Sequence, residues 1–175
     1  MDRARSRLAA SGLVMAAVSS ILCLAVTAAP AQARPGARSN APVIPSTAFI
    51  SVHVDVLNFS FVRLTLQSSG VTSGIFTPGQ FPPTVIPASN GLPGKAAWQS
   101  ESDGIATGTE GFASYLGVSL AIGTVLVTFF WDDPAVGSNS YGCSVPLHNL
   151  TCTTLGGSGY HANVTFVLTR RVSNT

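Results

Sequence analysis

The feature that most limits what this chain can fold into is the alternation of apolar and polar side chains in short segments. Residues 50–56 place Ile or Val at every second position, and residues 61–67 and 160–172 repeat the pattern. Successive side chains of an extended chain point to opposite faces, so the alternation predicts half-buried strands. After residue 33 no segment keeps a helical period for more than a turn or two. The sequence therefore predicts an all-β domain.

Further short apolar segments, each bounded by Gly, Asp or Pro, are predicted as strands over 96–101, 111–115, 118–122 and 125–131. The last of these is almost continuously apolar, so we expect it to be central and covered on both faces. About seven short strands separated by turn residues favour an antiparallel β-sandwich.

Two connections between the predicted strands have a clear sequence signal. Residues 58–60 form a short link between the first two strands, which predicts a hairpin. Residues 70–94 carry five prolines and several glycines together with apolar anchors. We interpret this stretch as a long ordered loop rather than a flexible linker.

The N-terminus has the organisation of a secretory signal. Arg3, Arg5 and Arg7 precede an uncharged stretch with an apolar centre, which ends in Ala31-Gln32-Ala33. A basic region, an apolar region and a small-residue cleavage site in this order predict that residues 1–33 are a signal peptide and that the protein is secreted. A retained signal anchor is the alternative, and the helix-breaking Pro30 and the cleavage site argue against it.

Cleavage changes the charge of the chain. Three of the nine basic residues and one of the seven acidic residues lie within residues 1–33, which leaves six of each. A balanced charge leaves no basic footprint for nucleic acid. Residues 34–46 contain three prolines and are predicted to be a flexible lead-in. Residues 47–175 are predicted to form one domain.

The two cysteines that remain after cleavage are Cys143 and Cys152. In an exported protein the favoured interpretation is a disulfide between them, which would stabilise the fold by roughly 2–3 kcal/mol. Two buried, reduced thiols are the alternative.

Few residues offer catalytic or metal-binding chemistry. His53 and Asp55 share one face of a strand and could form an acid–base pair, so a hydrolase is one hypothesis. A solvated face of the sheet explains both residues more simply. Asp132 and Asp133 are adjacent and point to opposite faces, which is unsuited to a paired-carboxylate mechanism. His161 has no ligand spacing with the cysteines. We predict no enzymatic activity, no metal and no cofactor.

Three sequence motifs resemble those of a known family. They are Trp-Gln-Ser-Glu-Ser-Asp-Gly at 98–104, Thr-Gly-Thr-Glu-Gly at 107–111, and Trp-Asp-Asp-Pro at 131–134 followed by Gly-Ser-Asn-Ser-Tyr at 137–141. The aegerolysins have a Gly-Thr-x-Gly turn, a strand pair, and a Trp-Asp-x-Pro turn followed by an asparagine and an aromatic residue. The order and spacing match over residues 98–141, so the chain resembles an aegerolysin.

This resemblance implies an actinoporin-like, aegerolysin-like β-sandwich that binds membrane lipid, in some family members with a larger pore-forming partner protein. Trp and Tyr settle at the headgroup level of a bilayer because they combine an apolar body with a polar tip. The candidate lipid-binding residues are Trp98, Trp131, Asp132 and Tyr141. The residues expected to form structural turns are Gly108, Thr109, Gly111 and Pro134.

Alternatives to this interpretation stay open. The aromatic candidates are equally compatible with places in the core, and Asp132 with a role in organising the turn before Pro134. The chain also has Asp133 where familiar aegerolysins have a cysteine and Ala135 where they have an aromatic residue, so lipid specificity is not carried over. An extracellular protein- or glycan-binding structural module without lipid activity is the alternative function.

Overall fold

A computed structural model describes residues 48–120, 123–145 and 149–171. The chain divides into two units, Met1–Gln32 and Ala33–Thr175, and all described residues belong to the second. The predicted signal peptide and the lead-in over 34–46 lie outside the described residues. Within the described ranges, no helix is long and apolar enough to cross a membrane.

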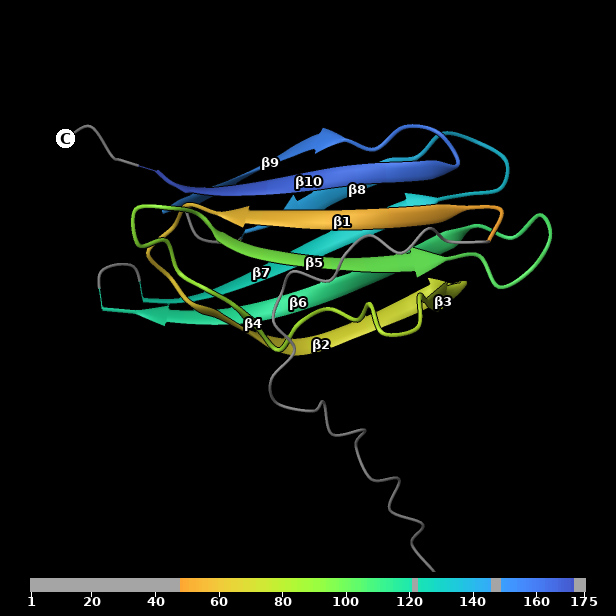
Figure 1. The fold of residues 1–175 in the computed structure, drawn as a ribbon. Helices are drawn as coiled ribbons and strands as arrows, with labels where there is room; N and C mark the ends of the chain where they lie inside the picture. The colour runs from red at the N-terminus through yellow and green to blue at the C-terminus, as the bar shows by residue number, and fades with distance from the viewer. Residues whose placement is uncertain (1–47, 121–122, 146–148, 172–175) are drawn as a thin grey trace, which may run out of the picture. The chain divides into compact units, whose positions relative to one another are not determined.

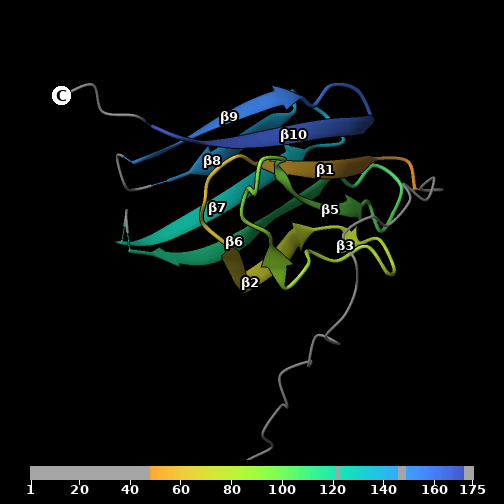
Figure 2. The ribbon, with the colours of Figure 1, turned by 60° about the vertical axis from the view of Figure 1, so that its left-hand side comes forward.

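The described residues form ten strands in two sheets that pack face to face (Figure 1 and Figure 2). The first sheet has the order β3 (Ile75–Phe76), β5 (Gly94–Glu101), β1 (Ser51–Asn58), β10 (His161–Arg170) and β9 (Leu150–Gly156). The second has the order β4 (Val85–Ile86), β2 (Leu64–Ser73), β6 (Thr109–Ser119), β7 (Gly123–Asp133) and β8 (Ser140–Ser144). The predicted all-β sandwich is confirmed.

Large aromatic side chains join the two sheets at the centre of the core. Trp98 of β5 lies 6.4 Å from Tyr115, 5.9 Å from Phe129 and 6.0 Å from Trp131 between ring centroids, and these three partners come from β6 and β7 of the facing sheet. A fully buried side chain of this size contributes roughly 1.5–3 kcal/mol through the apolar area it removes from water. The alternating segments therefore bury one face each, as expected from their pattern.

The path between the first two strands differs from the predicted hairpin. β1 and β2 belong to different sheets, and β1 pairs with β10 in parallel, with Ser51 opposite His161. The buried Asn58 side chain donates hydrogen bonds to the carbonyl oxygens of Val62 and Pro87, both at 2.8 Å. These bonds hold the crossing between sheets, and the sandwich is mixed rather than purely antiparallel.

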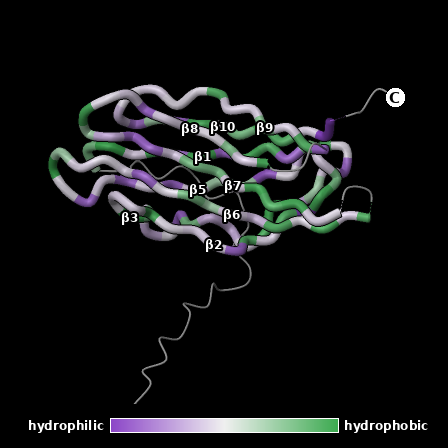
Figure 3. Tube along the Cα trace, turned by 180° about the vertical axis from the view of Figure 1, so that it is seen from behind, coloured by the Kyte–Doolittle hydropathy of each residue, from purple (hydrophilic) through white to green (hydrophobic). Residues whose placement is uncertain are grey.

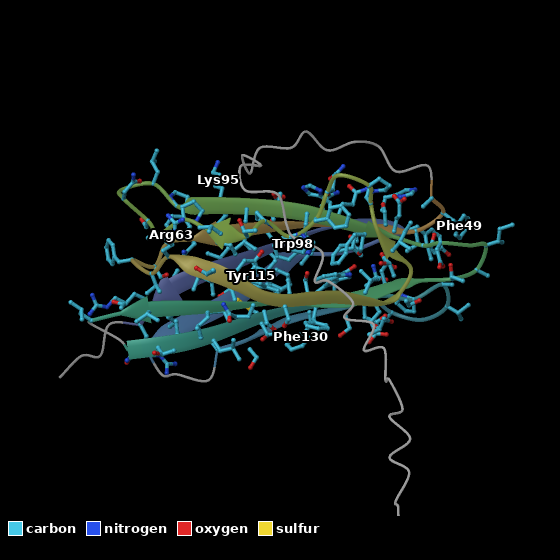
Figure 4. The ribbon with its side chains drawn as sticks, turned by 90° about the horizontal axis from the view of Figure 1, so that it is seen from below. Phe49, Arg63, Lys95, Trp98, Tyr115 and Phe130 are labelled. Carbon is cyan, nitrogen blue, oxygen red and sulfur yellow. A yellow bond between two sulfur atoms is a disulfide. The ribbon has the colours of Figure 1, made fainter. Side chains whose placement is uncertain are left out.

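Other strand predictions also need correction. The segments 111–115 and 118–122 are not two strands, because β6 runs without a break to Ser119. The predicted loop over 70–94 contains the end of β2 and the short strands β3 and β4. β8 and β9 were not predicted, since their Ser-, Thr- and Gly-rich sequences lack a regular apolar alternation. β7 is covered on one face only, because its outer side chains, such as Phe130, are exposed (Figure 4).

Candidate functional site

Trp98 and Trp131, the two tryptophans predicted to contact lipid, lie in the core. Each side chain is 1% exposed, and Figure 4 shows Trp98 beside Tyr115 in the interior. Neither indole N–H has a hydrogen-bond partner within the described part of the chain. The physical reason for this placement is that both rings point between the sheets from inward-facing strand positions. The folded sandwich therefore keeps both rings away from a bilayer surface.

Asp132 and Tyr141, the other two candidates, lie on neighbouring strands at one end of the sandwich, but their side chains are on opposite faces of the sheet. Tyr141 of β8 is opposite Trp131 of β7, and Asp132 is opposite Glu110 and Ser140. The Tyr141 hydroxyl accepts a hydrogen bond from Asn139 Nδ2 at 3.0 Å, and burial raises the pKa of Tyr141. Partial burial and the Glu110 carboxylate raise the pKa of Asp132.

The adjacent Asp133 points inward, as the alternation predicts. Its side chain is buried, and neither carboxylate oxygen has a hydrogen-bond partner among the described residues. Burial and the neighbouring Asp132 raise the pKa of Asp133 to about 6, while His161 opposes the shift. Near it, Ser51 Oγ and His161 Nδ1 are 2.9 Å apart. This polar group was missed because β1, β7 and β10 are distant in sequence and only the sheet packing brings their ends together.

These residue types resemble those of a nucleophilic hydrolase, but their connections differ. In a Ser-His-Asp triad the carboxylate orients the imidazole through one ring nitrogen while the other contacts the serine. Here the Ser51 hydroxyl is hydrogen-bonded to the His161 ring, and no hydrogen bond joins Asp133 to that ring in the described residues. His53 Nε2 lies 3.6 Å from Asp55 Oδ2 on β1. Groups of three or more His, Cys, Asp or Glu that could hold a metal are absent from the described residues.

The predicted turn residues occupy two kinds of position. Gly108 precedes β6, where a Cβ would lie 2.5 Å from the carbonyl oxygen of Asp133, and Pro134 follows β7 directly. Thr109 instead begins β6, and its hydroxyl donates a hydrogen bond to Ser100 Oγ at 2.8 Å in the interior. Gly108 and Pro134 thus lie in the connections directly next to β6 and β7, and Thr109 is a buried strand residue.

Gly111 is also a strand residue rather than a turn residue. It lies inside β6, opposite Trp131. A Cβ at this position would lie 2.5 Å from both Trp131 Cζ2 and the carbonyl oxygen of Gly70. Only a residue without a side chain allows the indole ring to lie across β6.

The predicted disulfide between Cys143 and Cys152 is present. The bond joins β8 to β9, and the two Cα atoms are 6.2 Å apart. Each strand is the edge of its own sheet, so the disulfide links the two sheets along one side of the sandwich.

Several of the exposed apolar side chains lie at the two ends of the sandwich, most of them in the connections between strands. At the end where β1 stops, on the left of Figure 1, they are Phe59, Phe61, Leu92, Val118 and Leu120. At the end where β1 starts, they are Phe49, Ile105, Val136 and Tyr160. Phe49 and Tyr160 contact each other with ring centroids 5.3 Å apart. Sequence reasoning overlooked these residues because isolated apolar residues in turns carry no periodic signal.

Comparison with known proteins gives matches at the level of structure. No protein-family model and no curated protein matches the sequence. The lipid-binding protein Nakanori superposes with a TM-score of 0.57 and 14% identity, over 69% of this chain and 71% of Nakanori. RahU, solved in complex with a Tris molecule, superposes with a TM-score of 0.56 and 21% identity, over 73% of this chain and 100% of RahU. The described domain is therefore an aegerolysin-like β-sandwich, as the resemblance in residues 98–141 implied.

Proposed function

We propose that this protein is a peripheral lipid-binding module that works outside the cell. The observation that carries the proposal is the set of exposed apolar side chains in the end connections, of which Phe61 is 69% and Leu92 is 75% exposed. A cross-linked sandwich holds such side chains outward, where a bilayer interface can take them up. The fold shared with the lipid-binding protein Nakanori supports lipid as the partner.

The residues that make this contact differ from those that the motifs suggested. Trp98 and Trp131 support the surface from inside, since they fix the two sheets against each other. Burying one exposed Phe or Leu side chain fully in an apolar phase contributes roughly 1.5–3 kcal/mol, so a few partly inserted side chains suffice for reversible association.

Vesicle sedimentation tests this function directly. The protein, without residues 1–33, is mixed with vesicles of phosphatidylcholine, phosphatidylethanolamine, phosphatidylglycerol, sphingolipid or sterol mixtures. We expect the protein to pellet with at least one mixture. Failure to bind any mixture would refute lipid binding. Binding to a glycan array without binding to any vesicle would favour the protein- or glycan-binding alternative.

Secretion and lysis are separate parts of the proposal. Export predicts that the protein recovered outside the cell begins at Arg34, which N-terminal sequencing checks. A larger pore-forming partner predicts that vesicles coated with this protein retain a trapped dye until that partner is added. Dye release by the protein alone would contradict a partner-dependent role.

A further inference from the structure

Charged side chains separate along the strands of the sandwich. All four Lys and Arg side chains in the described residues are exposed and lie where β1 and β10 stop: Arg63, Lys95, Arg170 and Arg171. Five of the six described acidic residues lie where β1 starts: Glu101, Asp103, Glu110, Asp132 and Asp133. Figure 4 shows Arg63 and Lys95 at one end and Phe49 at the opposite end. We call these the basic end and the acidic end.

Strand pairing brings the cations of the basic end together. Lys95 of β5 is opposite Leu57 near the end of β1, and Asn58 is opposite Leu168 of β10, two residues before Arg170. The amide N–H of Arg171 donates a hydrogen bond to the Asn149 carbonyl oxygen at 2.9 Å. The positive charge thus comes from the β1–β2 connection, the first part of β5 and the end of β10.

Apolar residues of the basic end are held near these cations by backbone pairing. The amide N–H of Phe59 donates a hydrogen bond to the Leu168 carbonyl oxygen at 2.8 Å, which holds Phe59 beside β10. Leu64, the residue after Arg63, pairs with Gly117, the residue before Val118. Figure 3 shows the hydrophobic ends of β6 and β7 and the hydrophilic end of β10 on the side of the C-terminus.

The two ends are far enough apart to act independently. The strands between them have 8 to 11 residues, which corresponds to roughly 25–35 Å. The Debye length at physiological ionic strength is only about 8 Å. An anionic surface that approaches the basic end is therefore attracted by its cations, and the carboxylates of the acidic end are too far away to weaken this attraction.

We propose that the basic end is the surface that docks on membranes and that it selects bilayers with anionic headgroups. Phe59, Phe61 and Leu92 enter the membrane interface. The basic side chains bind phosphate or carboxylate groups of the lipids, and they are Arg63, Lys95, Arg170 and Arg171. The acidic end, although it also exposes apolar side chains, faces away because an anionic surface repels its carboxylates. This inference rests on the proposed lipid binding and adds its orientation and lipid class.

Charge variants test the lipid class. Binding is measured by sedimentation on phosphatidylcholine vesicles with and without phosphatidylglycerol. Each basic residue near an anionic surface strengthens binding about fivefold, so R63Q/K95Q should bind the mixed vesicles roughly 25-fold more weakly. High salt should also weaken wild-type binding to the mixed vesicles, because it screens the attraction between the basic side chains and the anionic headgroups. The matched control D103N/E110Q, which removes two exposed charges at the acidic end, should bind within about twofold of wild type.

Tryptophan variants test the orientation. Phe61 and Phe49 are similarly exposed, at 69% and 59%, but lie at opposite ends, and the native tryptophans are buried. In F61W the added indole should shift to shorter emission wavelength on vesicle binding and be quenched by brominated lipid. In F49W the emission should not change. Far-UV circular dichroism of each variant checks that the sandwich is retained.

The outcomes separate this inference from the function on which it rests. If no vesicle binds, lipid binding itself fails. If vesicles bind but R63Q/K95Q leaves binding unchanged, or if F49W responds in place of F61W, lipid binding stands and the basic end is not the docking surface. Anionic selectivity that is lost in R63Q/K95Q, with insertion reported by F61W, supports the inference.

Discussion

The disulfide between Cys143 and Cys152 makes a quantitative prediction about stability. It closes a loop with a sequence separation of 9 and connects the edge strands of the two sheets. For a loop of this length, the loss of chain entropy in the unfolded state corresponds to about 2.6 kcal/mol at 25 °C. C143A/C152A should therefore have a free energy of unfolding lower by about this amount. Its melting temperature should fall by roughly 10 °C.

The two buried tryptophans provide the assay. Trp98 and Trp131 become exposed only when the sheets separate, so their emission follows urea-induced unfolding. Reducing agent should destabilise the wild type by a similar amount and leave C143A/C152A unchanged, which serves as the control. Hydrogen exchange should accelerate first in β8 and β9, because they are edge strands. A difference below about 1 kcal/mol between oxidised wild type and C143A/C152A would refute the loop-entropy argument.

Three further predictions follow from buried groups. Because the pKa of Asp133 is raised from 3.8 to about 6, the folded protein binds this proton more tightly than the unfolded chain does. The Asp133 contribution to the free energy of unfolding therefore falls as pH rises from about 4 to about 6. D133N should remove that part of the pH dependence, and an unchanged pH profile of urea midpoints would contradict this. G111A should destabilise by about 1–3 kcal/mol, because its Cβ would meet the Trp131 ring and the Gly70 carbonyl oxygen. G142A, whose Cβ would meet open space, is the control in thermal melts. Y115F should lose about 1 kcal/mol, since the buried Tyr115 hydroxyl donates to the Pro83 carbonyl oxygen at 2.9 Å, and equal urea midpoints would count against that bond.

The sequence was informative wherever the signal is local. Alternation over 50–56 and 160–172 reflects one buried face per strand, and this pattern alone predicted β1 and β10. The spacing of Cys143 and Cys152, together with the predicted export, was enough to predict the disulfide. The motifs over 98–141 indicated the aegerolysin-like sandwich, because their order and spacing within one continuous segment resemble those of the aegerolysins.

The sequence was least informative about the candidate site. The alternation that predicts a strand does not say which of two sheets the strand joins, so the β1–β2 hairpin was wrong. For the same reason the sequence did not decide whether Trp98 and Trp131 are exposed or buried. The facing sheet covers both rings in the structure. Asp133, Ser51 and His161 meet only through the ends of strands that are distant in the chain.

The sequence by itself determined the all-β character of the domain, the strands with a regular alternation and the disulfide, because each depends on residues close together in the chain. Only the tertiary structure decided which aromatic residues are available to a membrane and that the charges separate into a basic end and an acidic end. Arg63, Lys95 and Arg170 are far apart in sequence, and their charges act together only because the strands end at the same side of the two sheets.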